Sequence, residues 1–198
     1  MIRSAISIDR DREVYAADDL VLGRRVAIKT MACGAHLRRE AQALAELHHP
    51  ALVTVHGFGV HRATPYLVME HLFGLSLAEL ATRGLAWRDA VEILIRVADG
   101  LAVVHDAGIA HRDLRAERVM ICGGGRAVLV DLGAMAASDE GGVRDDVRAF
   151  GVLAEGVLPR AGVPPRLASV IRLCATAPSM DHVAWELRAS IGSRRMHH

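Results

Sequence analysis

Four charged residues stand out by their type and by their surroundings: Lys29, Glu40, Asp113 and Asp131. Lys29 is the only lysine among the 24 basic residues, which raises the question of what a compact ammonium does there that a guanidinium cannot. The simpler alternative is chance under a strong compositional bias. The two aspartates lie in short segments between predicted helices and strands. An ammonium and several carboxylates could together bind anions, hold a cation or move a proton, provided that the fold brings them together.

Composition limits the functional class. The chain has 198 residues, of which 52% are hydrophobic and 24% charged, as in globular domains. Lys+Arg is 24 and Asp+Glu is 23, and this balance argues against a nucleic-acid binder. Three widely spaced cysteines are typical of reduced thiols, and no apolar stretch approaches the roughly 20 residues of a membrane span. We therefore expect a cytoplasmic protein without a membrane or nucleic-acid partner.

The first third of the chain predicts an antiparallel sheet with one helix. Strand patterns and turn residues alternate there, and the helical pattern stops before Pro50. The predicted strands are Ile2–Ile8, Glu13–Ala17, Arg25–Thr30, Leu52–Val60 and Pro65–His71, and the predicted helix is His36–Leu47.

The rest of the chain is predicted to be mainly helical. Ser76 and Glu79 form a capping box, and apolar residues at helical spacing predict a helix over Trp87–Asp106 that ends at Gly108. Two short strands and three further helical stretches follow. The predicted segments are Val119–Cys122 and Ala127–Val130 as strands, then helices around Val147–Leu158, Arg166–Ala175 and His182–Ile191. The fold class expected is α+β.

The order of four short segments resembles the eukaryotic-like (Hanks-type) serine/threonine protein kinases. Val26–Lys29 ends a strand, Glu40 lies on the next helix, His111–Leu114 follows the long helix, and Asp131–Gly133 follows a strand. The resemblance implies a two-lobed, minimal kinase-like domain. Its N-terminal lobe would be residues 1–72, and its trimmed helical C-terminal lobe residues 73–198.

The resemblance also implies a role for each charged residue. Lys29 would contact the phosphates of ATP while Glu40 holds it, Asp113 would orient the acceptor hydroxyl, and Asp131 would hold Mg²⁺. The residues implied around the adenine are Val14, Ala27, Met69, Glu70, Leu72 and Met120. The alternative for the apolar ones is ordinary core packing.

The stretch before the second predicted strand departs from the family. Kinases have glycines there, so that backbone N–H groups can approach the phosphates, but residues 7–12 contain none. Arg10 or Arg12 could reach a phosphate through its side chain, although Asp9 and Asp11 would oppose this. The alternative is a charged, solvated hairpin.

Arg118 replaces the asparagine that binds the second metal in the family, and a guanidinium cannot ligate Mg²⁺. Arg118 could contact a phosphate in place of the metal, or it could pair with Asp131 and block metal binding. The sequence leaves both open. No pair of the eleven histidines has convincing metal-ligand spacing.

The segment after Asp131 is short, and it lacks the Ala-Pro-Glu motif of the family. The surface that binds peptide substrates in ordinary kinases is therefore expected to be missing. Arg115 stands where the family has a lysine, which keeps the positive charge.

Two functions remain open from the sequence. The first is a phosphotransferase that moves the ATP γ-phosphate to a hydroxyl, with serine or threonine of a protein as acceptor. The second is a pseudokinase, a nucleotide-binding or scaffold module that regulates a protein partner without phosphoryl transfer. A third, of low weight, is transfer of another part of the nucleotide. The arginine-rich composition suggests a bacterial source.

Overall fold

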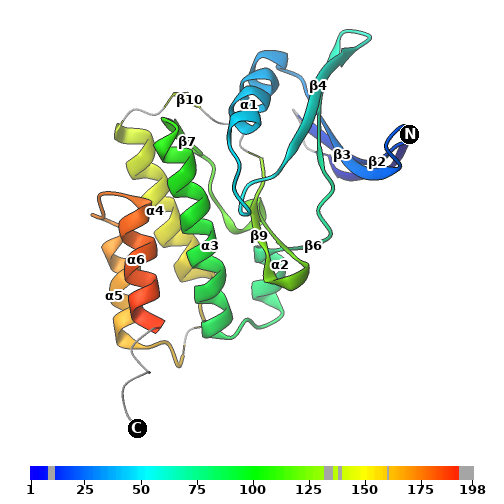
Figure 1. The fold of residues 1–198 in the computed structure, drawn as a ribbon. Coiled ribbons are helices and arrows are strands. Elements are labelled where there is room, and N and C mark those ends of the chain that lie inside the picture. Colours follow the sequence, from blue (N-terminus) through cyan, green and yellow to red (C-terminus); the bar gives the residue numbers. More distant parts are fainter. Residues whose placement is uncertain (9–11, 132–135, 138–139, 160, 192–198) are drawn as a thin grey trace. The chain divides into compact units, whose positions relative to one another are not determined.

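The computed structural model describes residues 1–8, 12–131, 136–137, 140–159 and 161–191. The chain forms two compact units (Figure 1). The first contains residues 1–48 and 52–73, and the second contains residues 49–51 and 74–198. No helix within the described ranges is both long and apolar enough to span a membrane.

The first unit is built on a five-stranded antiparallel sheet with the strand order β1-β2-β3-β5-β4. Its strands are β1 (Ile2–Ile8), β2 (Arg12–Asp19), β3 (Arg24–Met31), β4 (Val55–His61) and β5 (Thr64–Glu70). The β2–β3 hairpin turns at Gly23, whose φ of 62° suits a residue without a Cβ. The register of this hairpin is unbroken from Arg12 opposite Met31 to Asp19 opposite Arg24.

Helix α1 (Gly34–Glu46) packs on this sheet through an apolar cluster. Leu37 and Ala41 of the helix are buried against Leu67 of β5. These residues recur at helical spacing, so that one face of α1 is removed from water and its position on the sheet is fixed. The predicted sheet with a single helix is therefore present.

The predicted starts of strand β4 and of the helix around Val147–Leu158 were wrong, and the helix begins earlier, at Glu140. Strand β4 begins at Val55, whereas the sequence pattern placed its start at Leu52. Leu52 and Val53 are buried, but they precede the strand. The backbone N–H of Thr54 donates to the side chain of Glu70 at 2.9 Å, and the Thr54 carbonyl accepts the backbone N–H of Glu70 at 2.9 Å.

The second unit is mainly helical. Its helices are α2 (Leu77–Thr82), α3 (Trp87–Asp106), α4 (Glu140–Val157), α5 (Pro165–Leu173) and α6 (Met180–Ile191). Its short strands are β6 (Gly74–Ser76), β8 (Val119–Cys122) and β9 (Ala127–Leu129) in one antiparallel sheet, and β7 (Ile109–Ala110) with β10 (Ala136–Ala137) in another.

Helix α3 forms the centre of this unit and has the bounds that its apolar spacing predicted. It packs against α4 and α6, which lie alongside it in Figure 1. Its Gly100 lets Ala51 and Leu129 approach, because a Cβ at this position would lie 2.9 Å from the Ala51 Cβ. The predicted capping box of Ser76 and Glu79 is present, and Gly108 has a φ of 72°.

Candidate functional site

Lys29 and Glu40 form a buried ion pair in the first unit. The Lys29 Nζ donates to the two Glu40 carboxylate oxygens at 2.8 and 2.6 Å, and each side chain is only 2% exposed. Strand β3 presents the lysine, and the packing of α1 places the glutamate against it. Burial lowers the pKa of Lys29, although the Glu40 carboxylate favours its charged form. The pair predicted from the sequence is thus formed.

Three of the residues expected around adenine share one face of the sheet with Lys29. Val14 lies directly opposite Lys29, and Met69 lies directly opposite Ala27, two residues before Lys29 on the same strand. Glu70 ends β5, and Leu72 follows it with a half-buried side chain. Met120 lies on β8 of the second unit. Contact of these residues with adenine remains a prediction.

Asp146 organises the loop of the second unit that carries Asp113. It lies on α4, is 1% exposed, and accepts the backbone N–H of His111 at 2.6 Å and of Arg112 at 2.7 Å. The His105 ring Nε2 lies 2.9 Å from the same carboxylate. Arg112 has a φ of 62°, a strained backbone for a residue with a Cβ. These bonds hold the backbone just before Asp113 in one conformation.

The sequence assigned no role to Asp146. The signal in the sequence was the stretch Asp146–Gly151, which resembles the family after the Asp131–Gly133 triad, but it assigned no partner to the Asp146 side chain. Burial raises the pKa of Asp146. Hydrogen bonds from His105 and from the two backbone N–H groups outweigh this effect, so the pKa lies below the ordinary value of 3.8. The buried carboxylate is therefore stabilised in its charged form.

Arg118 joins the two aspartates that the sequence singled out. Its Nη2 donates to the Asp113 Oδ2 at 2.9 Å, and its Nη1 forms an ion pair with the Asp131 carboxylate. The Arg118 side chain is only 9% exposed, and Arg115 lies 3.6 Å from the other oxygen of Asp113. Of the two possibilities for Arg118, the structure has the pairing with Asp131.

The backbone around Arg118 supports this arrangement. The Arg118 N–H closes a short 3₁₀ turn (Ala116–Arg118), and its carbonyl accepts the Val130 N–H at 2.9 Å. Asp131, the next residue, has a φ of 68°. The rest of the Asp131–Gly133 triad lies outside the described residues. Arg118 thus connects the Asp113 loop to the end of β9 by both backbone and side chain.

Comparison with known protein families matches residues 9–150 to the protein kinase domain. The chain belongs to the protein kinase family. This confirms the resemblance and the trimmed, two-lobed kinase fold that the ordered motifs predicted.

The curated relatives of this kinase domain include bacterial serine/threonine kinases. The chain is 37% identical over 145 residues to a probable serine/threonine-protein kinase of Streptomyces coelicolor, covering 66% of this chain and 22% of the relative. It is 39% identical over 133 residues to the serine/threonine-protein kinase pkn2 of Myxococcus xanthus, covering 61% and 16%. The match to PrkC of Bacillus subtilis is 32% over 130 residues, covering 61% and 20%. The matched region is thus about a fifth of each relative's length.

Protein kinases generally use ATP and Mg²⁺. The residues of this domain fit a phosphate group of ATP, but they do not fit Mg²⁺ in their present arrangement. A buried, acid-paired Lys29 fits a phosphate group. Asp131 does not fit Mg²⁺ as it stands, because Arg118 holds its carboxylate. Within the described residues, no group of three or more His, Cys, Asp or Glu side chains could hold a metal ion. The metal role predicted for Asp131 therefore requires Arg118 to move.

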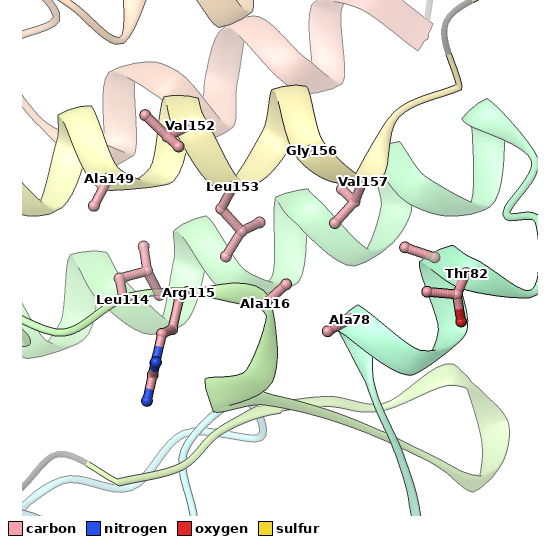
Figure 2. Close-up of a pocket in the computed structure, with 11 residues that line it drawn as sticks. Ala78, Thr82, Leu114, Arg115, Ala116, Ala149, Val152, Leu153, Gly156 and Val157 are labelled. Atoms are coloured by element: carbon pink, nitrogen blue, oxygen red, sulfur yellow. The ribbon is translucent and has the colours of Figure 1, made fainter.

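An apolar groove of about 660 Å³ lies in the second unit beside the Asp113 loop. Figure 2 shows Leu153 and Val157 of α4 on one side of it, and Ala116 of the loop and Ala78 of α2 on the other. Arg115 is the only charged side chain among its lining residues. The groove offers an apolar surface without a carboxylate that could act as acid or base.

The Lys29–Glu40 pair can be tested by a double-mutant cycle. Lys29→Met and Glu40→Leu should each lower the free energy of unfolding by about 3 kcal/mol, because each leaves a buried charge without its partner. The loss of unfolding free energy in the double variant should be smaller than the sum of the two single losses by about 2 kcal/mol. Urea unfolding, with hydrogen exchange of the β3 and α1 amides, measures these free energies.

The exposed pair of Arg148 and Asp145 on α4, 3.4 Å apart, is the matched control. Its coupling energy should stay below about 1 kcal/mol. Additive effects of the Lys29 and Glu40 substitutions would contradict the assignment of this pair as a coupled buried unit.

Asp146 makes a separate, pH-dependent contribution to the free energy of unfolding. Because its folded-state pKa lies below the unfolded value of 3.8, its stabilisation is full above that value and is lost as pH falls through the folded-state pKa. Asp146→Asn should cost about 3 kcal/mol at pH 7, and the difference from wild type should shrink below about pH 4. Urea unfolding followed by the fluorescence of Trp87 and Trp185, both in the second unit, measures this.

Asp145→Asn is the control, because the Asp145 side chain is 72% exposed and pairs with the surface residue Arg148 at 3.4 Å. It should change the free energy of unfolding by less than about 0.5 kcal/mol. A cost of Asp146→Asn that is the same at every pH would show that its charge is not what stabilises the loop.

Proposed function

We propose that this kinase domain is a pseudokinase that binds an ATP-class nucleotide through Lys29 and regulates a protein partner. The observation that carries the proposal is the contact of the buried Arg118 side chain with both Asp113 and Asp131. A guanidinium offers only N–H donors, so it occupies a carboxylate oxygen of each aspartate and competes with a cation for these oxygens. Nucleotide binding would then depend on protein cations and not on Mg²⁺.

The state of Asp113 supports the same proposal. One of its carboxylate oxygens accepts from Arg118, and the other faces Arg115. A base that orients a substrate hydroxyl must be within hydrogen-bond reach of that hydroxyl. Here two guanidinium groups compete with the hydroxyl for the carboxylate, which disfavours phosphoryl transfer.

The second candidate is an active protein kinase that phosphorylates serine or threonine hydroxyls. The Lys29–Glu40 pair and the loop held by Asp146 favour it, because a phosphotransferase also needs both. The serine/threonine kinases among the relatives are consistent with it. This candidate requires Arg118 to leave Asp131 before the carboxylate can bind Mg²⁺. A protein partner, a cytoplasmic location and the absence of nucleic-acid partners remain predictions.

One substitution separates the two candidates. Arg118→Asn restores the residue of the family and releases Asp131. We expect the wild-type domain to bind ATP equally well in EDTA and in Mg²⁺, and to incorporate no phosphate. Arg118→Asn should make ATP affinity rise at least about tenfold on addition of Mg²⁺, because one charge-assisted contact is worth about 1.4 kcal/mol or more. Isothermal titration and incorporation of labelled γ-phosphate measure the two properties.

Arg148→Asn is the matched control, since this arginine is 61% exposed and pairs with an aspartate away from Asp131. It should leave ATP binding independent of Mg²⁺. Incorporation of phosphate by the wild type that requires Mg²⁺ and is lost in Asp131→Asn would establish the second candidate. No binding of ATP at millimolar concentration would reject both candidates.

A further inference from the structure

Helix α1 and the β4–β5 hairpin of the first unit line a groove of about 560 Å³. The helix packs against both strands, and it lies beside β4 in Figure 1. Phe58 and Val60 of β4 and Pro65 of β5 give the groove an apolar floor. Arg38 and Arg39 of α1 add two positive charges at its side. The groove is of the size that takes up a side chain or a small ligand.

The fold of the first unit holds the walls of this groove in place. A Cβ at Gly34, the first residue of α1, would lie 2.9 Å from the Pro65 ring, so the helix start and the hairpin are in close contact. The hairpin turns at Arg62 and Ala63, whose φ values of 46° and 66° are those of a two-residue turn between twisted strands. Phe58 packs against the apolar cluster that joins α1 to the sheet. The surface is therefore formed before any partner binds.

The two arginines carry charges that are not neutralised within the described part of the chain. Glu40 is the next residue on α1, but it is buried and uses both carboxylate oxygens for Lys29. Among the described residues that line the groove none is Asp or Glu, and Arg38 and Arg39 form no ion pair with any described residue. The Arg38 guanidinium carbon lies 5.7 Å from the centre of the Phe58 ring. One positive charge is thus placed over the apolar floor.

This combination of charge and apolar surface indicates the chemistry of the partner. Val60 is 58% exposed, so a ligand that covers it removes apolar surface from water. The planar donors of an arginine match the two oxygens of a carboxylate. A nucleic acid would need a wider basic surface, whereas the chain has 24 Lys and Arg against 23 Asp and Glu. The groove therefore complements a carboxylate next to an apolar side chain.

We propose that this groove binds a peptide segment of a protein partner in which acidic residues flank a large apolar side chain. The apolar side chain lies on Phe58 and Val60, and the carboxylates face Arg38 and Arg39. The inference deepens the proposed function, because it names the regulated partner by its chemistry, and it does not depend on nucleotide binding.

Selection from a random peptide library, with the complete chain as bait, tests the proposal. We expect the selected peptides to be rich in Asp and Glu around a Leu, Phe or Trp. The most enriched peptides are then synthesised and titrated into wild type and variants. Arg38→Glu and Arg39→Glu should each weaken binding about tenfold, because attraction becomes repulsion. Val60→Thr should weaken it about threefold by loss of apolar contact, and added salt should weaken binding to the wild type.

Arg88→Glu is the matched control. Arg88 also lies over an aromatic ring, that of Trp87 at 4.5 Å, but it belongs to α3 of the second unit. The substitution changes the net charge as Arg38→Glu does, and it should leave the peptide affinities unchanged. Melting temperatures of the variants without peptide should agree, which shows that each is folded.

Three results would overturn the inference. The first is a set of selected peptides without acidic residues, and the second is an affinity that both charge reversals leave unchanged. The third is a wild-type dimer in sedimentation that Arg38→Glu dissociates, which would assign the groove to a second copy of this chain.

ATP titrated into the same samples separates this inference from the proposed function. A chain that binds ATP but selects no acidic peptide loses this inference alone. A chain that binds the acidic peptides but no ATP supports this inference and loses the nucleotide binding of the proposed function.

Discussion

The account depends on one buried guanidinium that two carboxylates share. Arg118 is 9% exposed and contacts both Asp113, which is 42% exposed, and Asp131, which is 12% exposed, so removing it would take a cation from a largely buried carboxylate at Asp131. Such a loss is costly, because a desolvated charge then lacks this compensation. The same residue joins β9 to the Asp113 loop through its backbone carbonyl. Arg118 therefore connects the Asp113 loop to the end of β9 both by its charge and by its backbone carbonyl.

An arginine is an incomplete substitute for a divalent ion. It carries one positive charge instead of two and presents its donors in a fixed plane, whereas Mg²⁺ requires oxygen ligands in an octahedral arrangement. A kinase domain in which an arginine takes the place of Mg²⁺ can keep the geometry of its loops. It then lacks the divalent ion that neutralises the phosphate group during its transfer. The intact Lys29–Glu40 pair and the Asp146 contacts are consistent with preserved geometry.

The sequence predicted the fold because its motifs occur in order and on the expected elements. The resemblance to the kinase family also implied the Lys29–Glu40 pair, which the structure shows. The sequence marked Asp146 only as the start of a family-like stretch, Asp146–Gly151, and did not predict its partners, because only the tertiary fold shows what a buried side chain contacts. For the same reason it left two roles open for Arg118, whose partner depends on how the chain bends at Asp131.

A crystal structure of the domain with ATP and Mn²⁺ tests the central claim most directly, because Mn²⁺ occupies Mg²⁺ sites and is located by its anomalous scattering. The account predicts bound nucleotide with Arg118 still paired to Asp131, and no Mn²⁺ at that carboxylate. Mn²⁺ bound by Asp131, with the Arg118 side chain displaced from it, would contradict the account.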